Sequence, residues 1–114
     1  MLTGILSMGS AYHYGVYIMR SINGGASSKI AVGDAGGSRV QIHARSFSNN
    51  DANSMSSVPI NILDLPNTTY SVNYVVYGYA GVATIYMNRT NNDTNAATIE
   101  GSRGYSVLIA REIN

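Results

Sequence analysis

Apolar and polar side chains alternate with a period of two along most of this chain of 114 residues. No segment sustains the 3.6-residue period of an amphipathic helix. In a β-strand, successive side chains point to opposite faces, so an alternating pattern places apolar residues on one face and polar residues on the other. The sequence therefore predicts an all-β fold of half-buried antiparallel strands.

Seven or eight strands are expected, separated by turn signals at the spacing typical of a two-sheet sandwich. The clearest strand is 70–79, which is rich in Tyr and Val, the residues that suit pleated surfaces. The other strands are expected at 12–20, 29–32, 39–45, 58–62, 82–88 and 105–110. Residues 2–8 are either an edge strand or the stump of a longer domain. A tight hairpin is expected at 80–81 and surface loops at 46–57 and 89–101, all within a single domain spanning residues 1–114.

Charged residues make up only 11% of the chain, and seven basic and six acidic side chains leave a formal charge of +1. This balance lacks the positive charge typical of nucleic-acid-binding proteins. No stretch approaches the roughly 20 apolar residues of a membrane span, and residues 1–6 are not expected to act as a signal peptide. The chain has no cysteine, so its core or its neighbours must stabilise it in place of disulfides. We therefore expect no nucleic-acid partner and no insertion into a membrane.

Motifs for cofactors or metals are weak. The glycine-rich segment 33–38 lacks the Lys-Ser/Thr pair of a phosphate-binding loop, and a strand is expected after it, so a turn is the better interpretation. The two histidines, His13 and His43, have no partners at zinc-ligand spacing. Calcium binding by residues 91–93 would lack the EF-hand pattern. No cofactor and no metal are expected.

Motifs for catalysis are equally weak. No Gly-x-Ser-x-Gly elbow exposes a nucleophilic serine. Asp51 and Asp93 are the carboxylates that we would test as the acid pair of a polysaccharide-cleaving enzyme. Because so small a domain carries only six carboxylates, we rank an enzyme behind non-enzymatic functions.

The nine tyrosines carry the most functional information. Four share predicted faces with valines, which favours packing in the core or between subunits: Tyr12, Tyr14, Tyr70 and Tyr74. Three are expected to be more exposed: Tyr77, Tyr79 and Tyr86. An exposed aromatic ring beside Asn and Asp can stack on a sugar while those side chains bind its hydroxyls. The candidate receptor-binding residues are therefore Tyr79, expected at a hairpin tip, and six polar loop residues, Asn49, Asn50, Asp51, Asn91, Asn92 and Asp93.

Four short motifs follow one another between residues 16 and 113. The first is a strand ending in Arg20, followed by a Gly-Asp-Ala-Gly-Gly-Ser-Arg turn at 33–39. The second is an Asp-Leu-Pro-Asn-Thr loop at 64–68 that precedes a strand with Tyr70. The third is an Asn-Arg-Thr strand end at 88–90 with Asp93 shortly after, and the fourth is the closing Glu112-Ile113. In order and spacing they resemble a domain common at the carboxyl ends of tail fibres and other virion proteins of tailed phages, many of them marine.

This resemblance implies a jelly-roll-like sandwich, similar to tumour-necrosis-factor and complement-type trimers, with roles in virion structure and attachment to the host. The chain departs from the family in two places. Only residues 1–10 stand where members carry one or two further strands. Arg111 stands where members tend to have an apolar residue.

The leading hypothesis is a non-enzymatic virion domain of a tail fibre or capsid surface, assembled in the host cytoplasm. It would associate with itself, as a trimer by the resemblance, and with other virion proteins. Attachment to a host glycan or protein would rely on avidity, and the low charge predicts binding that is insensitive to salt. The alternative is a capsid or tail decoration subunit without a host ligand, and the third hypothesis is the polysaccharide-cleaving enzyme.

Overall fold

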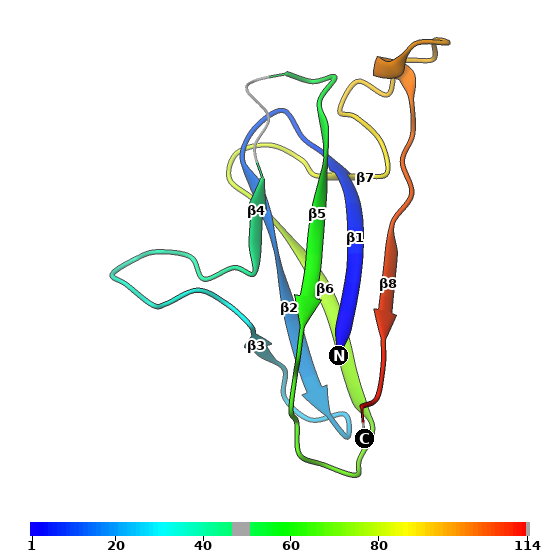
Figure 1. Ribbon diagram of the computed structural model, residues 1–114. Coiled ribbons are helices and arrows are strands. Elements are labelled where there is room, and N and C mark those ends of the chain that lie inside the picture. The colour runs from blue at the N-terminus through cyan, green and yellow to red at the C-terminus, as the bar shows by residue number, and fades with distance from the viewer. Residues whose placement is uncertain (47–50, 114) are drawn as a thin grey trace.

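The computed structural model describes residues 1–46 and 51–113. Within these ranges, eight antiparallel strands form two sheets, accompanied by one 3-10 turn and no α-helix (Figure 1). The strands are β1 (Leu2–Gly9), β2 (Tyr14–Ile22), β3 (Ser28–Ile30), β4 (Ala44–Ser46), β5 (Met55–Ile62), β6 (Val72–Ala80), β7 (Tyr86–Met87) and β8 (Val107–Ala110), and the 3-10 turn η1 is Ile99–Gly101. The predicted all-β fold of two antiparallel sheets is confirmed.

β1 lies at the centre of the first sheet. It pairs with β5 along one side, from Leu2 opposite Ile62 to Gly9 opposite Met55, and with β8 and β7 along the other side. Gly4 permits the close approach of β8, because a Cβ at this position would overlap the carbonyl oxygen of Val107. Of the two alternatives for residues 2–8, the edge strand is wrong, since these residues form a strand with partners on both sides.

β2 lies at the centre of the second sheet. It pairs with β6 along its whole length, from Tyr14 opposite Ala80 to Ile22 opposite Val72. On its other side, β4 pairs with the first part of β2 and β3 with the last part. The turn from β2 to β3 contains Asn23 and Gly24 with φ of 53° and 71°, a backbone region that glycine and asparagine tolerate best. The turn signal in the sequence is confirmed.

The core fills the space between the two sheets. Its members come from the inward faces of β1, β2 and β5: Leu2, Leu6, Met8, Tyr14, Val16, Ile18, Val58, Ile60 and Ile62. Burial of a large apolar side chain contributes about 1.5–3 kcal/mol, so this cluster supplies most of the driving force for folding. Tyr14 keeps its hydroxyl satisfied in the core by donating a hydrogen bond to the Met8 carbonyl at 3.2 Å.

The segment that precedes β4 differs from its prediction. A half-buried strand was expected at 39–45, but β4 begins only at Ala44, and residues 31–43 form a loop that projects from the sandwich (cyan in Figure 1). Ala31 has a φ of 51°, which turns the chain away from β2. The loop then bonds to itself, because Gln41 donates from Nε2 to the Gly33 carbonyl at 2.7 Å. The next predicted loop, 46–57, is shorter than expected, since β5 begins at Met55.

The predicted hairpin at 80–81 is also wrong. After Ala80 the chain leaves the second sheet, and β7 pairs with Met8 and Gly9 of β1 in the first sheet. The strand expected at 82–88 is reduced to the two residues of β7, and the last strand begins at Val107 in place of Tyr105. Local alternation predicted these strands but contained no information on which sheet each would join.

Candidate binding surfaces

The two polar loops predicted to contact a receptor meet at one end of the sandwich. Asn92 donates from its backbone to the Ala52 carbonyl at 3.0 Å and from Nδ2 to Oδ1 of Asn53 at 3.0 Å. The structure therefore brings Asp51, Asn91, Asn92 and Asp93 into the same region. Asn49 and Asn50 lie outside the described residues.

Asp51 and Asp93 are both held by hydrogen bonds within these loops. Asp51 accepts from the backbone of Asn53 at 2.9 Å and from the Ser54 hydroxyl at 3.1 Å. Asp93 accepts two hydrogen bonds from Arg103, at 2.8 and 3.0 Å, and lies 3.7 Å from Arg89. Sequence reasoning missed Arg103, because no short motif connects it with Asp93.

The hydrogen bond from Arg103 and the charges of Arg103 and Arg89 hold the pKa of Asp93 below its usual range. A general acid in a glycosidase needs a raised pKa, so the shift at Asp93 has the opposite direction.

The Asn-Arg-Thr motif at 88–90 forms the base of this loop. Asn88 accepts a hydrogen bond from the Ser106 hydroxyl at 2.6 Å, which links β7 to the segment before β8. The Arg89 guanidinium lies 4.0 Å from the centre of the Tyr86 ring. The buried hydroxyl of Thr90 accepts from the backbone of Asp93 at 3.0 Å. These three side chains therefore contact other parts of the same chain and hold the loop in place.

Two other motif residues, Arg20 and Asp64, form an ion pair. Arg20 Nη1 donates to Asp64 Oδ1 at 2.6 Å, and the Tyr74 hydroxyl donates to Asp64 Oδ2 at 2.8 Å. The cluster joins β2 and β6 of the second sheet to the segment that leaves β5 of the first. It therefore fastens the two sheets together at this end.

Burial acts to raise the pKa of Asp64, but the hydrogen bonds from Arg20 and Tyr74 and the charge of Arg20 outweigh it, so the pKa of Asp64 lies below its usual range. Burial, together with the hydrogen bond to the Asp64 carboxylate and its charge, raises the pKa of Tyr74 to about 12.

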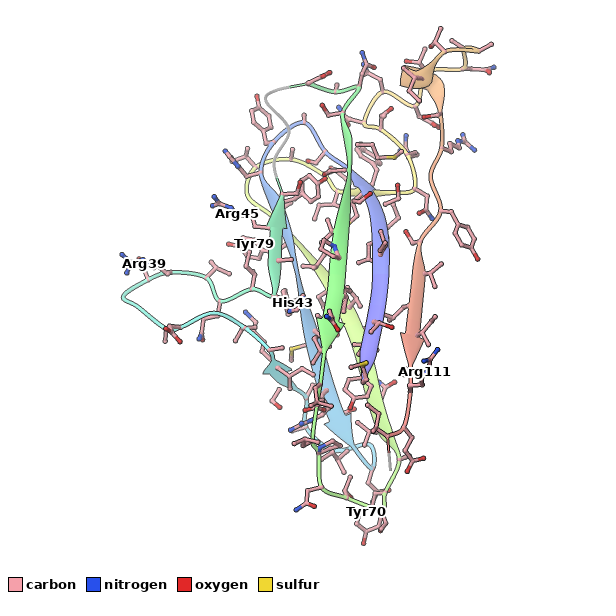
Figure 2. All side chains as sticks on the ribbon, viewed as in Figure 1. Arg39, His43, Arg45, Tyr70, Tyr79 and Arg111 are labelled. Carbon is pink, nitrogen blue, oxygen red and sulfur yellow. The ribbon has the colours of Figure 1, made fainter. Side chains whose placement is uncertain are left out.

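Tyr79 lies on the outer face of the second sheet and not at a hairpin tip (Figure 2). Its side chain is 43% exposed. On the same strand and face, Tyr77 stacks on Tyr17 of β2, with ring centres 5.3 Å apart and planes inclined by 10°. The ammonium group of Lys29 lies 4.4 Å from the centre of the Tyr17 ring. The predicted exposure of Tyr77 and Tyr79 is confirmed.

The other tyrosine predictions have mixed outcomes. Tyr14 is buried and Tyr74 packs against the core, as their shared faces with valines predicted. Tyr12 and Tyr70 are exposed, so their assignment to the core is wrong. Both lie outside the strands, where the alternating pattern no longer governs which way a side chain points. Tyr86 is half-buried beneath Arg89. Packing of the exposed tyrosines between subunits stays a prediction.

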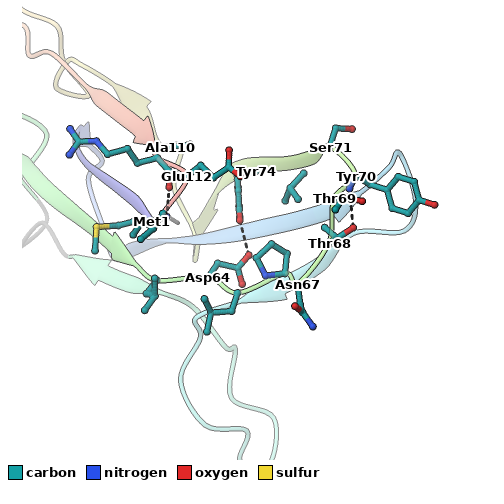
Figure 3. A pocket seen from close by; sticks show the side chains of 16 residues that line it. Met1, Asp64, Asn67, Thr68, Thr69, Tyr70, Ser71, Tyr74, Ala110 and Glu112 are labelled. Carbon is teal, nitrogen blue, oxygen red and sulfur yellow. Dashed lines mark hydrogen bonds between the residues drawn. The ribbon is translucent and has the colours of Figure 1, made fainter.

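A cleft of about 1250 Å³ lies at the end of the sandwich where Asp64 and Tyr74 meet (Figure 3). Its walls are the loop 63–72 and the carboxyl-terminal segment 110–113, with Met1 between them. Met1 and Arg111 hold the wall in place, because the Arg111 backbone donates to the Met1 carbonyl at 2.8 Å and the Met1 amino group donates to the Arg111 carbonyl at 2.6 Å. The sequence offered no signal for this cleft, since its two walls are distant in the chain.

Within the part of the chain that the structure describes, no three His, Asp or Glu side chains gather as a metal site would require. No helix in that part is long and apolar enough to cross a membrane. No family model, no curated protein and no solved structure matches the chain.

Proposed function

We propose that this domain is a non-enzymatic attachment domain of a phage virion, which binds a carbohydrate on the host surface. The observation that carries the proposal is the tyrosine face, the outer face of the second sheet on which Tyr17, Tyr77 and Tyr79 lie. Tyr79 makes no hydrogen bond or ring contact with any described residue, and it lies on β6, which pairs with β2 along its whole length. Aromatic side chains of this kind bind ligands with little loss of conformational entropy, because they have only two rotatable bonds.

The setting in a virion rests on the four motifs that resemble tail-fibre domains. Arg20, Asp64 and the residues at 88–90 lie in structural contacts that hold the sandwich together. Motif residues with structural roles support a shared fold more than a shared ligand.

Self-association is part of the same proposal. All four side chains of β8 are exposed, including Val107, Leu108 and Ile109, and among the described strands β8 pairs only with β1. A contact with further copies would cover this apolar edge. We expect a trimer, which light scattering would detect as a species of about 36 kDa, three times the 12.1 kDa of one chain.

The test of the attachment function is a glycan array with the wild-type chain and two variants. Tyr79→Ala removes an exposed ring of the tyrosine face, and Tyr70→Ala removes an even more exposed ring at the other end of the sandwich. We expect binding to at least one glycan, loss of that binding in Tyr79→Ala and retention in Tyr70→Ala. Absence of binding to every glycan would contradict the attachment function.

The second candidate is a decoration or stabilising subunit of the capsid or tail. The exposed apolar edge at β8 favours it, because such an edge needs a protein partner and no host ligand. This candidate predicts a stable oligomer that binds nothing on the array.

A further inference from the structure

We infer that the ligand of the tyrosine face is an acidic saccharide, one that carries a carboxylate, and that it binds across β6, β2 and β4 and not at the polar loops. This inference rests on the proposed carbohydrate-binding function and specifies its site and its ligand class. The outer face of the second sheet combines three features that such a ligand requires: an exposed ring, an apolar floor and unopposed positive charge.

The ring and the floor follow from the register of the sheet. Tyr79 of β6 is opposite Gly15 of β2, and Gly15 is opposite Arg45 of β4, so the three residues form one row on one face. Gly15 has no side chain in this row. The Ile42 side chain occupies the space, since its Cδ1 would lie only 2.8 Å from a Cβ placed on Gly15. Neighbouring strands are about 4.8 Å apart, so the backbones that carry Tyr79 and Arg45 are separated by roughly 10 Å. A single sugar ring fits within that span.

The charge on this face has one sign. The strands β2, β3, β4 and β6 contain three basic residues and no acidic residue: Arg20, Lys29 and Arg45. Asp64 neutralises Arg20 on the inner side of the sheet. Lys29 contacts the Tyr17 ring and donates to the Gln41 carbonyl at 3.1 Å, which leaves its positive charge without an anionic partner.

Arg45 is exposed and makes no hydrogen bond or ion pair with any described residue. A guanidinium binds a carboxylate through two parallel hydrogen bonds, so Arg45 is suited to the acid group of a sugar that stacks on Tyr79.

A second copy of this chain fits the face less well than an external acid does. Asp64 is paired with Arg20, Asp93 with Arg103, and Asp51 accepts hydrogen bonds within its own turn. The other three acidic residues lie apart, in the projecting loop, in η1 and in the carboxyl-terminal segment, as Asp34, Glu100 and Glu112. The acidic side chains that the structure describes therefore form no patch that could complement Lys29 and Arg45.

The test compares acidic glycans with their neutral counterparts. The immobilised probes are polygalacturonate and its methyl ester, and sialylated oligosaccharides with and without the sialic acid. We expect at least one acidic probe to bind, with an affinity about tenfold higher than that of its neutral counterpart, equivalent to about 1.4 kcal/mol. Raising NaCl from about 0.05 to 0.5 M should weaken this binding, because the charges are at the surface. This salt dependence replaces the insensitivity expected from the low overall charge, because Lys29 and Arg45 lie on one face without an anionic partner in the described part of the chain.

Two pairs of variants locate the site. Tyr79→Ala and Arg45→Gln should each weaken binding of the acidic probe about tenfold, a loss of about 1.4 kcal/mol. Tyr70→Ala and Arg111→Gln are matched controls, because they remove an exposed ring and an exposed cation elsewhere, as Figure 2 shows. Circular dichroism and thermal melting confirm that each variant is folded.

Each outcome separates the inference from the function on which it rests. Equal binding of acidic and neutral probes overturns the acidic ligand class and leaves carbohydrate binding intact. Acidic binding that Tyr79→Ala and Arg45→Gln do not weaken, or that the controls weaken equally, overturns the site. Absence of binding to every saccharide overturns both the inference and the proposed function.

Discussion

Replacement of Asp64 by Asn should destabilise the domain by about 2 kcal/mol. The Asp64 and Arg20 side chains are only 11% and 23% exposed, so their pair lies between an exposed pair, worth about 0–1 kcal/mol, and a fully buried one, whose disruption costs about 3–5 kcal/mol. Asparagine keeps the shape of the side chain. Its amide can still serve both neighbours, because the Tyr74 hydroxyl can accept a hydrogen bond as well as donate one. The loss therefore reports mainly on the charge.

Urea unfolding measures this loss, and a double-mutant cycle with Arg20→Gln isolates the pair. We expect a coupling energy of about 1.5 kcal/mol between positions 20 and 64. Arg103→Gln serves as the control, since Arg103 and Asp93 form an exposed pair, and its effect on stability should be smaller. A coupling energy below about 0.5 kcal/mol would refute the role of the pair in joining the sheets.

The same variant has a characteristic dependence on pH. The pKa of Asp64 is lower in the folded chain than its unfolded value of about 3.9. The stability contributed by Asp64 is therefore fully present above the unfolded pKa and is lost as the pH falls through the folded pKa. The difference in unfolding free energy between wild type and Asp64→Asn should be constant at neutral pH and should shrink below about pH 4.

Three further predictions concern the core, the first sheet and Tyr74. Since the folded pKa of Tyr74 is about 12, the stability that Tyr74 contributes is complete below about pH 10 and is lost as the pH rises toward 12. In urea unfolding, Tyr74→Phe should abolish this part of the loss of stability at high pH. Ile18→Ala should cost about 3 kcal/mol in the same assay and Val75→Ala about 0.5 kcal/mol or less, and equal losses would contradict the assignment of faces in the second sheet. Gly4→Ala should cost about 2 kcal/mol and speed hydrogen exchange of the β8 amides; unchanged exchange would show that β8 does not need that close approach.

The sequence predicted the strands better than their arrangement. Alternation at Val58, Ile60 and Ile62 identified β5 and its buried face, because a half-buried strand repeats its environment every two residues. The same alternating pattern gave a wrong prediction of a strand at 40–44. There Ile42 lies over Gly15 on the outer face while Ala44 packs on the core, since the regular pairing with β2 includes only Ala44–Ser46.

Long-range pairing explains the other differences. β1 became a central strand because β5, β7 and β8 supply its partners, and no local signal marks a strand as central. For the candidate sites, the sequence predicted the exposure of Tyr79 but not that Arg45 lies in the same row, because that row depends on the register of three strands. It identified Asp93 as a candidate but not Arg103, whose contact depends on how a polar loop folds back.

The central position of β1 affects how this molecule can fold. β5 pairs with one side of β1 and β8 with the other, so Leu2 lies between Ile62 and Ala110 in the completed sheet. In the order of synthesis β1 precedes both partners, so it stays unpaired until β5 is made and keeps one open side until β8 is made. Contacts this distant in sequence slow folding, and an unpaired apolar strand is prone to aggregation in the meantime. Yield of soluble protein should therefore depend on chaperones and on growth temperature more than the modest size of the domain suggests.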